Sequence, residues 1–272
     1  DGLLSSLARL WPASLTLTGT WHDALLLYGA SVAFGSTVHC KFHWIFTFTY
    51  GGSTAFASLA TLASFWKLGA PMTSVAIAAA PLCYGVRLAS FLGWRELCTG
   101  WRALFNELPP LPKRLGAQAT IPIIYPLLSS PAYFALLSPV EPTPLVYGGL
   151  AVAYTALCLE SCFDLEKSYY KARDPKRTAT SGSFSIVRHP SYTAELLFWS
   201  GLYVAGMPSY TSWQAWVPTT VGLVAIYNVM FAASARLSAT QNKRYGDEGY
   251  YRAWVASTPR LVPRAVAPPS AY

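Results

Sequence analysis

Long stretches without Asp, Glu, Lys or Arg alternate along the chain with short stretches in which the charged residues gather. A membrane-spanning helix needs about 20 consecutive, mostly apolar residues to cross the hydrocarbon core of a bilayer. By that criterion the pattern predicts spanning helices at residues 24–40, 42–66, 68–86 and 142–159, of which the first is just long enough.

Two other uncharged stretches do not have the pattern of one simple helix. Residues 115–140 contain Pro122, Pro126 and Pro131, so this segment is predicted to be kinked or re-entrant. Residues 196–235 are long enough for two helices, and Gly206-Met207-Pro208 predicts a turn between them. The predicted fold is therefore all-α, a polytopic transmembrane helical bundle with six to seven spans.

The charged stretches are predicted to lie outside the hydrocarbon core. In residues 87–114, Arg87, Arg95 and Arg102 alternate with Leu, Phe and Trp, which predicts a helix that leaves the membrane and lies along its surface. Pro109 and Pro110 are expected to end that helix. Residues 236–272 are basic, aromatic and Pro-rich, and too polar to span.

Composition supports a membrane protein, because only 12% of the residues are charged and 53% are hydrophobic. Soluble domains have about 25% charged residues. Alternating the spans places every Lys and Arg except Arg9 and Lys67 on one side, which is the expected cytoplasm-like side. Orientation in a membrane thus explains the net charge of +8 better than nucleic-acid binding does. We treat residues 1–272 as a single integral-membrane domain.

No metal site is predicted. His39 and His43 are four residues apart but lack a third ligand, so polar residues at the membrane interface are the favoured interpretation. Cys158 and Cys162 lie in or beside an apolar run and are interpreted as small core residues.

The most informative segment is residues 181–201. Pro190 is predicted to be the first residue of a helix, because proline has a preset φ and lacks an N–H that would be unpaired there. Arg188 and His189 then lie at a helix N-terminus, which favours an anion. Tyr192 and Glu195 are three residues apart and share a face of this helix. Glu195 either pairs with a cation to join two helices or accepts hydrogen bonds from a ligand.

Two other charged segments could contribute to such a site. Glu160, Asp164 and Lys167 share one helical face that extends the span at residues 142–159. They are either exposed ion pairs or functional groups, and acids so close to a span favour function. The tail interleaves Lys and Arg with Tyr and Trp, which suits anionic lipid headgroups or the phosphates and rings of a dinucleotide.

These segments together resemble the C-terminal half of the membrane superfamily of steroid 5-alpha-reductases, sterol C14-reductases and isoprenylcysteine carboxyl methyltransferases. The resemblance covers residues 84–105 and 155–264. The second range is the half of the chain that bears the motifs. Its ordered blocks are the acidic helix end Glu160, Asp164 and Lys167; R-H-P-x-Y-x-x-E at Arg188, His189, Pro190, Tyr192 and Glu195; the ending Tyr251, Trp254, Thr258, Pro259 and Pro263; and a weaker R-L-x-x-x-L-x-x-R from Arg87 to Arg95.

The resemblance implies a cavity on the cytoplasmic side for a soluble cofactor and a lipid substrate that arrives from the bilayer. In the reductase branch the cofactor would be NADPH, and in the methyltransferase branch S-adenosylmethionine. The residues that the resemblance places at the cofactor are Asp164, Lys167, Arg188, His189, Tyr192, Glu195, Tyr245, Tyr251 and Arg252. The motifs identify no catalytic acid.

The chain departs from the family pattern at three positions. Ser191 replaces an Asn, Ala194 replaces a Gly, and Glu166 stands where a Gln is usual. We therefore carry three hypotheses: an NADPH-dependent reductase of a sterol-like or other lipid double bond, a non-catalytic structural subunit of a large organellar membrane complex, and a lipid or prenyl-cysteine methyltransferase. The expected location is the endoplasmic reticulum or a plastid or mitochondrial membrane. The basic side would face the cytosol, stroma or matrix, and the partners would be membrane lipids, a lipid substrate or other subunits.

Overall fold

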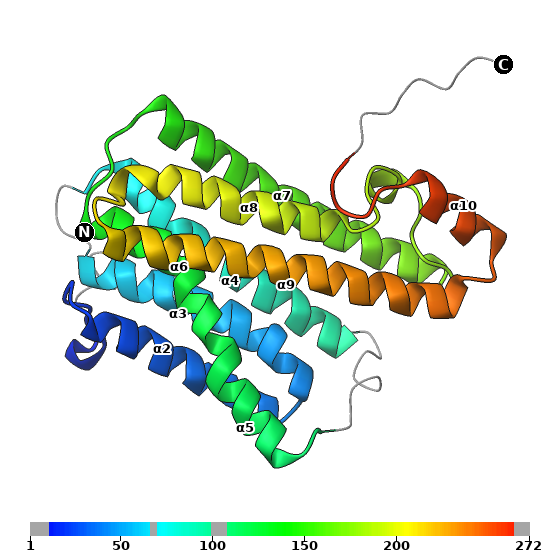
Figure 1. Cartoon of the computed structure of the whole chain (residues 1–272), viewed down its shortest axis with the longest axis horizontal. Helices are drawn as coiled ribbons and strands as arrows, with labels where there is room; N and C mark the ends of the chain where they lie inside the picture. The colour runs from blue at the N-terminus through cyan, green and yellow to red at the C-terminus, as the bar shows by residue number, and fades with distance from the viewer. Residues whose placement is uncertain (1–10, 66–69, 99–107, 264–272) are drawn as a thin grey trace. The chain divides into compact units, whose positions relative to one another are not determined.

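The structure is a computed structural model that describes residues 11–65, 70–98 and 108–263. These residues form helices joined by turns and irregular segments, and none of them is in a β-strand (Figure 1). The α-helices are α2 (His22–Gly35), α3 (Phe48–Phe65), α4 (Met72–Cys98), α5 (Leu111–Thr120), α6 (Ile124–Leu137), α7 (Pro144–Arg173), α8 (Pro190–Gly206), α9 (Trp213–Tyr245) and α10 (Gly249–Ser257). The 3₁₀ helices are η1 (Ala13–Leu15), η2 (Ser36–His39), η3 (Phe42–Phe46), η5 (Ile121–Ile123), η6 (Gly182–Ser185) and η7 (Met207–Ser209).

Four segments of the described chain are long and apolar enough to cross a membrane, which confirms the class of all-α membrane protein. They are Met72–Cys98, Leu111–Leu137, Pro144–Arg173 and Trp213–Tyr245. The predicted span at residues 24–40 differs, because α2 has only 14 residues and is followed by the 3₁₀ helix η2. At 1.5 Å per residue α2 is about 21 Å long, short of the roughly 30 Å hydrocarbon core.

Two charged stretches continue the helices that precede them. Helix α4 runs without a break from Met72 to Cys98, so Arg87 and Arg95 lie on the same helix as the predicted span and not on a separate surface helix. Arg102, Arg9 and Lys67 lie outside the described residues. Helix α7 likewise contains both the apolar run and the acidic end of the predicted span. Charged residues with good helix propensity do not end a helix unless proline or glycine interrupts it.

Three of the proline-based predictions are confirmed, whereas Pro131 lies inside α6 without interrupting it. Pro122 lies in the 3₁₀ helix η5, which interrupts the segment between α5 and α6. Helix α8 ends at Gly206, η7 contains Pro208, and α9 begins at Trp213, so residues 196–235 form the predicted pair of helices. Pro190 is the first residue of α8.

The chain divides into two compact units. The first unit is Asp1–Ala153 with Trp199–Ile226, and the second is Tyr154–Phe198 with Tyr227–Tyr272. Helices α7, α8 and α9 each contribute residues to both units.

Small residues allow two helices of the first unit to pack backbone against backbone. A Cβ atom added at Gly149 of α7 would lie 2.6 Å from the backbone nitrogen of Ala205, and one added at Gly201 of α8 would lie 2.6 Å from that of Ala153. Both helices therefore have a glycine and an alanine four residues apart at their contact. Such small-residue pairs bring membrane helices close enough for extensive van der Waals packing.

Buried tyrosines of the first unit find hydrogen-bond partners within it. The indole Nε1 of Trp199 donates to the Tyr50 hydroxyl at 2.8 Å, and the Tyr125 hydroxyl donates to the Ile45 carbonyl at 2.7 Å. The rings of Tyr50 and Tyr125 stack with centroids 5.0 Å apart. These three aromatic side chains thus fill the apolar interior while the polar atoms named here remain hydrogen-bonded.

An aromatic cluster organises the second unit. Phe184 of η6 packs with Tyr245 of α9 and with Tyr251 and Trp254 of α10. The indole Nε1 of Trp254 donates to the Phe184 carbonyl at 2.7 Å. This cluster fixes the loop after α7 and the C-terminal helix to each other, and both lead into the predicted site.

Candidate functional site

The Arg188-His189-Pro190 turn lies against the segment that follows α10. The backbone N–H of Arg188 donates to the Pro259 carbonyl at 2.9 Å, and that of His189 donates to the Arg260 carbonyl at 3.2 Å. The Thr193 hydroxyl donates to the Leu261 carbonyl at 2.6 Å. Two sequence blocks separated by about 70 residues are thereby joined at one place.

His189 immediately precedes α8 and caps its first turn. Its carbonyl accepts hydrogen bonds from the backbone N–H groups of Tyr192 at 3.1 Å and Thr193 at 3.2 Å. Its side chain is only 5% exposed, and its Nε2 lies 2.8 Å from the Ser238 hydroxyl of α9. The imidazole is therefore held between two helices of the second unit.

The surroundings of His189 disfavour its charged form. Burial, together with the positive charges of Lys167, Arg188 and Arg260, lowers the pKa of His189 to about 4. The ring is thus neutral at neutral pH, although three cations surround it. A neutral imidazole offers one donor and one acceptor nitrogen.

Arg188 is a cation without a carboxylate partner in the part of the chain that the structure describes. Its Nε is buried and makes no hydrogen bond to those residues. Burial lowers the pKa of Arg188, Tyr251 opposes that shift, and Arg260 adds to it. An arginine carries its charge at any physiological pH. The N-terminus of α8, Arg188 and Arg260 therefore make a site with excess positive potential.

The acidic end of α7 is tied to this turn. The Ser191 hydroxyl, near the start of α8, donates to Asp164 Oδ1 at 3.0 Å. Glu166 accepts hydrogen bonds from the backbone N–H of Ser183 at 3.2 Å and from the Ser183 hydroxyl. Two of the three departures from the family pattern, Ser191 and Glu166, thus make hydrogen bonds that hold the loop between α7 and α8.

Aromatic residues of the tail lie next to this loop. The Tyr245 hydroxyl accepts a hydrogen bond from Lys171 Nζ at 2.9 Å, and the rings of Tyr245 and Tyr251 have centroids 6.0 Å apart. Tyr251 is 2% exposed, and burial raises its pKa while Arg188 lowers it. Arg252, the next residue on α10, is exposed.

The structure therefore brings together most of the residues predicted to bind a cofactor. Contacts or direct electrostatic interactions link His189 to Lys167, Arg188 and Tyr192, and link Arg188 to Tyr251. Of the remaining predicted residues, Asp164 is hydrogen-bonded to Ser191 and Tyr245 to Lys171. Glu195 is buried on α8, and Arg252 is exposed on α10. Ser238, which the sequence analysis missed, has no signal in the sequence beyond its place on α9.

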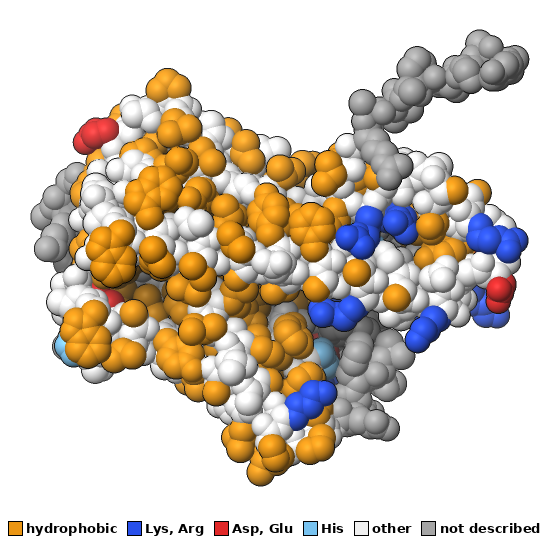
Figure 2. All heavy atoms as spheres, viewed as in Figure 1, with side chains coloured by type: hydrophobic (Ala, Val, Ile, Leu, Met, Phe, Trp, Pro, Cys, Tyr) orange, Lys and Arg blue, Asp and Glu red, His pale blue; other side chains and the backbone are white. Residues whose placement is uncertain are grey.

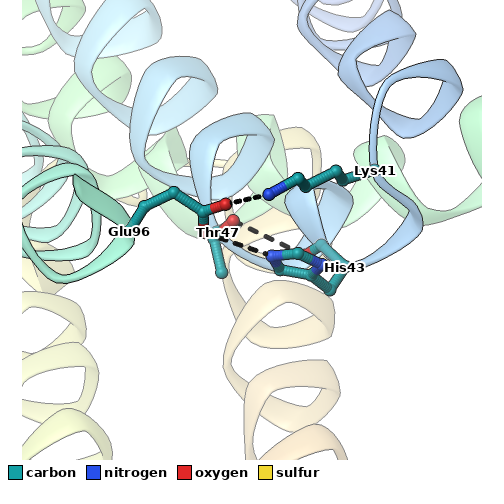
Figure 3. Close-up of polar contacts among 4 residues, drawn as sticks. All are labelled: Lys41, His43, Thr47 and Glu96. Atoms are coloured by element: carbon teal, nitrogen blue, oxygen red, sulfur yellow. Dashed lines mark hydrogen bonds and ion pairs between the residues drawn. The ribbon is translucent and has the colours of Figure 1, made fainter. Parts of the chain in front are cut away.

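A second charged cluster lies in the first unit and was not predicted. Glu96 of α4 is 5% exposed and pairs with Lys41 (Figure 3). His43 Nε2 lies 3.6 Å from Glu96 Oε2, and the Thr47 hydroxyl donates to the His43 carbonyl at 3.5 Å. The signal for this cluster was that Glu96 is the only acid between Asp23 and Glu107.

The two histidines, interpreted from the sequence as polar residues at the membrane interface, contact different side chains. His39 Nε2 lies 2.7 Å from Gln118 Oε1, whereas His43 faces Glu96. Within the described ranges no three His, Cys, Asp or Glu side chains are arranged to hold a metal ion.

The surface has two kinds of region that match the expected environments. Figure 2 shows Lys and Arg side chains gathered over the end of α9 and over α10 in the second unit, and hydrophobic side chains over the helices of the first unit. Apolar helix surfaces suit lipid, and basic helix ends suit the membrane–water interface.

One family model matches the chain, over residues 33–258, and its description is "Protein of unknown function (DUF1295)". The match includes every residue that the sequence places at the cofactor. No curated protein matches the chain. No solved structure matches it either.

Proposed function

The chain belongs to the DUF1295 family, and from this premise we propose that it is an integral-membrane reductase that uses NADPH to reduce a double bond of a lipid. The observation that carries the proposal is the state of Arg188. This cation has a buried Nε without a hydrogen-bond partner among the described residues, and it lies at the N-terminus of α8. Such a site is suited to bind an anionic group.

The charge of the site favours NADPH over S-adenosylmethionine. NADPH carries a pyrophosphate and a further phosphate, which match the cations Arg188 and Arg260 and the positive end of the α8 dipole. S-adenosylmethionine has one carboxylate against a sulfonium and an ammonium group, so three nearby cations would repel it. The neutral state of His189 leaves a ring nitrogen that can share a hydrogen bond with a phosphate or a ribose hydroxyl.

Each remaining residue has a role in positioning. Ser191 and Asp164 hold the start of α8 against α7, and the pairing of residues 188–189 with residues 259–260 fixes the turn. Tyr251 interacts electrostatically with Arg188 from within the aromatic cluster, which helps to hold the arginine in place. NADPH supplies the hydride when bound, and the protein orients it and provides the proton that completes the reduction. A tyrosine or a carboxylic acid would donate this proton.

The test is a binding titration of the purified protein in detergent with NADPH, NADH and S-adenosylmethionine. We expect saturable binding of NADPH, weaker binding of NADH, and no saturation with S-adenosylmethionine. Replacement of a buried charged partner costs about 2–5 kcal/mol of binding free energy, so Arg188→Gln should weaken NADPH binding at least about 30-fold. Arg236→Gln, an exposed arginine of α9, is the matched control and should bind as the wild type does.

A non-catalytic structural subunit is the second candidate, and one observation favours it. Ser191 and Glu166, which replace residues of the family pattern, both make hydrogen bonds within the loop that would face a cofactor. Under this alternative no nucleotide binds at millimolar concentration, and Arg188→Gln changes the melting temperature without any change in ligand binding. That pair of results would reject the reductase proposal.

A further inference from the structure

The first unit contains a cavity of about 670 Å³ that the proposed function does not use. Its walls come from the beginning of α2, from η5 and α6, and from the beginning of α9 with the residue that precedes it. Most of the side chains in these walls are apolar, among them Leu27, Pro126 and Leu127. A cavity of this volume is within the range of about 300–1,000 Å³ that is usual for sites of small organic ligands.

The cavity opens through an apolar surface. Leu25, Ile123 and Leu137 contribute to its walls, and 56%, 55% and 39% of their respective areas are exposed. In a chain with membrane-spanning helices, an exposed apolar surface of this kind suits contact with hydrocarbon. A ligand that reaches this cavity would therefore come from the bilayer, as a lipid does.

One wall holds a buried carboxylate. Asp23 of α2 is 4% exposed, and its two oxygens accept hydrogen bonds from the backbone N–H groups of Thr18 at 3.0 Å and Gly19 at 2.8 Å and from the Tyr133 hydroxyl at 2.8 Å. Both oxygens accept, which the ionised form of the side chain satisfies. Gly19 adopts a φ of +81°, which suits glycine and lets the turn wrap around this carboxylate.

The Asp23 carboxylate favours some lipids over others. A fatty acid or an acidic phospholipid would bring a second negative charge next to Asp23 in a region of low dielectric, where like charges repel strongly. An uncharged alcohol avoids this repulsion and can donate a hydrogen bond to a carboxylate oxygen or to the Tyr133 hydroxyl. Ser130 and Gln214 also line the cavity and offer further hydrogen-bonding groups.

We propose that this cavity binds a neutral lipid alcohol from the bilayer, with its apolar body among the leucines and prolines and its hydroxyl at Asp23 and Tyr133. The proposal does not depend on the reductase function, since every wall residue belongs to the first unit and the cofactor residues belong to the second. Failure of one therefore does not imply failure of the other.

The test compares two probes that differ only in the head group, radiolabelled oleyl alcohol and oleic acid. Binding to the purified protein in detergent is measured at an alkaline pH at which the acid is ionised. The alcohol should bind saturably and at least about tenfold more tightly than the acid, because like-charge juxtaposition costs several kcal/mol. Asp23→Asn keeps the shape of the wall and removes the charge, so the two affinities should become similar.

A filling variant tests the location. Ala24→Trp places a large ring in the wall of the cavity and should abolish saturable binding of the alcohol. Gly29→Leu is the matched control, because Gly29 lies on the same helix outside the cavity and a Cβ there meets nothing within 4 Å. The control should bind as the wild type does.

Three results would overturn the proposal. The first is equal affinity for alcohol and acid in the wild type. The second is an unchanged affinity in Ala24→Trp. The third is non-saturable partitioning that is the same in every variant, which would mean that the probe enters the detergent and not the protein. If Asp23→Asn does not fold, Tyr133→Phe replaces it, and loss of affinity for the alcohol is then expected.

Discussion

The neighbours of His189 determine its protonation state. A histidine next to a carboxylate would be charged at neutral pH, but here burial and three nearby cations keep the ring neutral. From the sequence, His189 could be placed at the start of a helix because a proline follows it. Its protonation state could not, because Lys167 and Arg260 are distant in the sequence and approach only through folding.

The lowered pKa predicts how stability depends on pH. The ordinary pKa is 6.5 and the folded value is about 4, so the unfolded chain takes up this proton first as the pH falls. Above pH 6.5 this group does not lower the free energy of unfolding. Between pH 6.5 and about pH 4 the free energy of unfolding falls progressively, by as much as about 1.4 kcal/mol per pH unit. His189→Asn should lack this part of the pH dependence. Thermal unfolding of both proteins in detergent between these pH values measures the difference, and parallel profiles would contradict it.

The role of Glu96 depends on a partner that is distant in the sequence. The sequence indicated a lone acid in a basic stretch, but nothing in it identified Lys41, 55 positions away, as the partner. Contacts between residues so far apart follow from tertiary packing, which neither helical periodicity nor segment length encodes.

Removal of Glu96 is predicted to destabilise the protein through the partner that remains. Glu96→Gln leaves Lys41 largely buried without a counter-charge, which should lower the free energy of unfolding by about 2 kcal/mol or more. The double variant Lys41→Met/Glu96→Leu removes both charges and should recover most of that loss. A double-mutant cycle of unfolding in detergent provides the coupling energy. Strictly additive effects would show that the pair does not interact.

At the scale of elements, proline and uncharged length were the reliable signals. They identified the start of α8, the interruption between α5 and α6, and the turn between α8 and α9. They failed at α2, which ends at Gly35 and continues as a 3₁₀ helix, and at Arg87, which lies within α4. In the first case an apolar run was longer than the helix that it formed. In the second, a charge did not end a helix.

The contact between α7 and α8 in the first unit provides a test at this scale. Gly149→Leu should destabilise the protein by about 1–3 kcal/mol or prevent folding, because its Cβ would overlap the backbone of α8. Gly148→Leu is a closely matched control, since a Cβ at Gly148 meets nothing within 4 Å. Melting temperatures of the two purified variants in the same detergent make the comparison. Equal melting temperatures would mean that the helices do not approach as closely as described.

At the scale of the whole molecule, the all-α membrane class followed from composition and the spacing of charges. The division into two units did not, because α7, α8 and α9 contribute to both and no linker separates them in the sequence. The order of the motif blocks indicated that residues around Asp164, Arg188 and Tyr251 belong to one site. The structure joins them within the second unit through Ser191 and the pairing of residues 188–189 with residues 259–260.

The central claim is that the N-terminus of α8 with Arg188 forms a binding site for the phosphates of NADPH. An electron cryo-microscopy map of the protein with saturating NADPH tests it most directly. The account predicts dinucleotide density with a phosphate in hydrogen-bonding contact with the Arg188 side chain at the N-terminus of α8. A map in which protein side chains fill this region, or in which NADPH lies away from Arg188, would contradict the account.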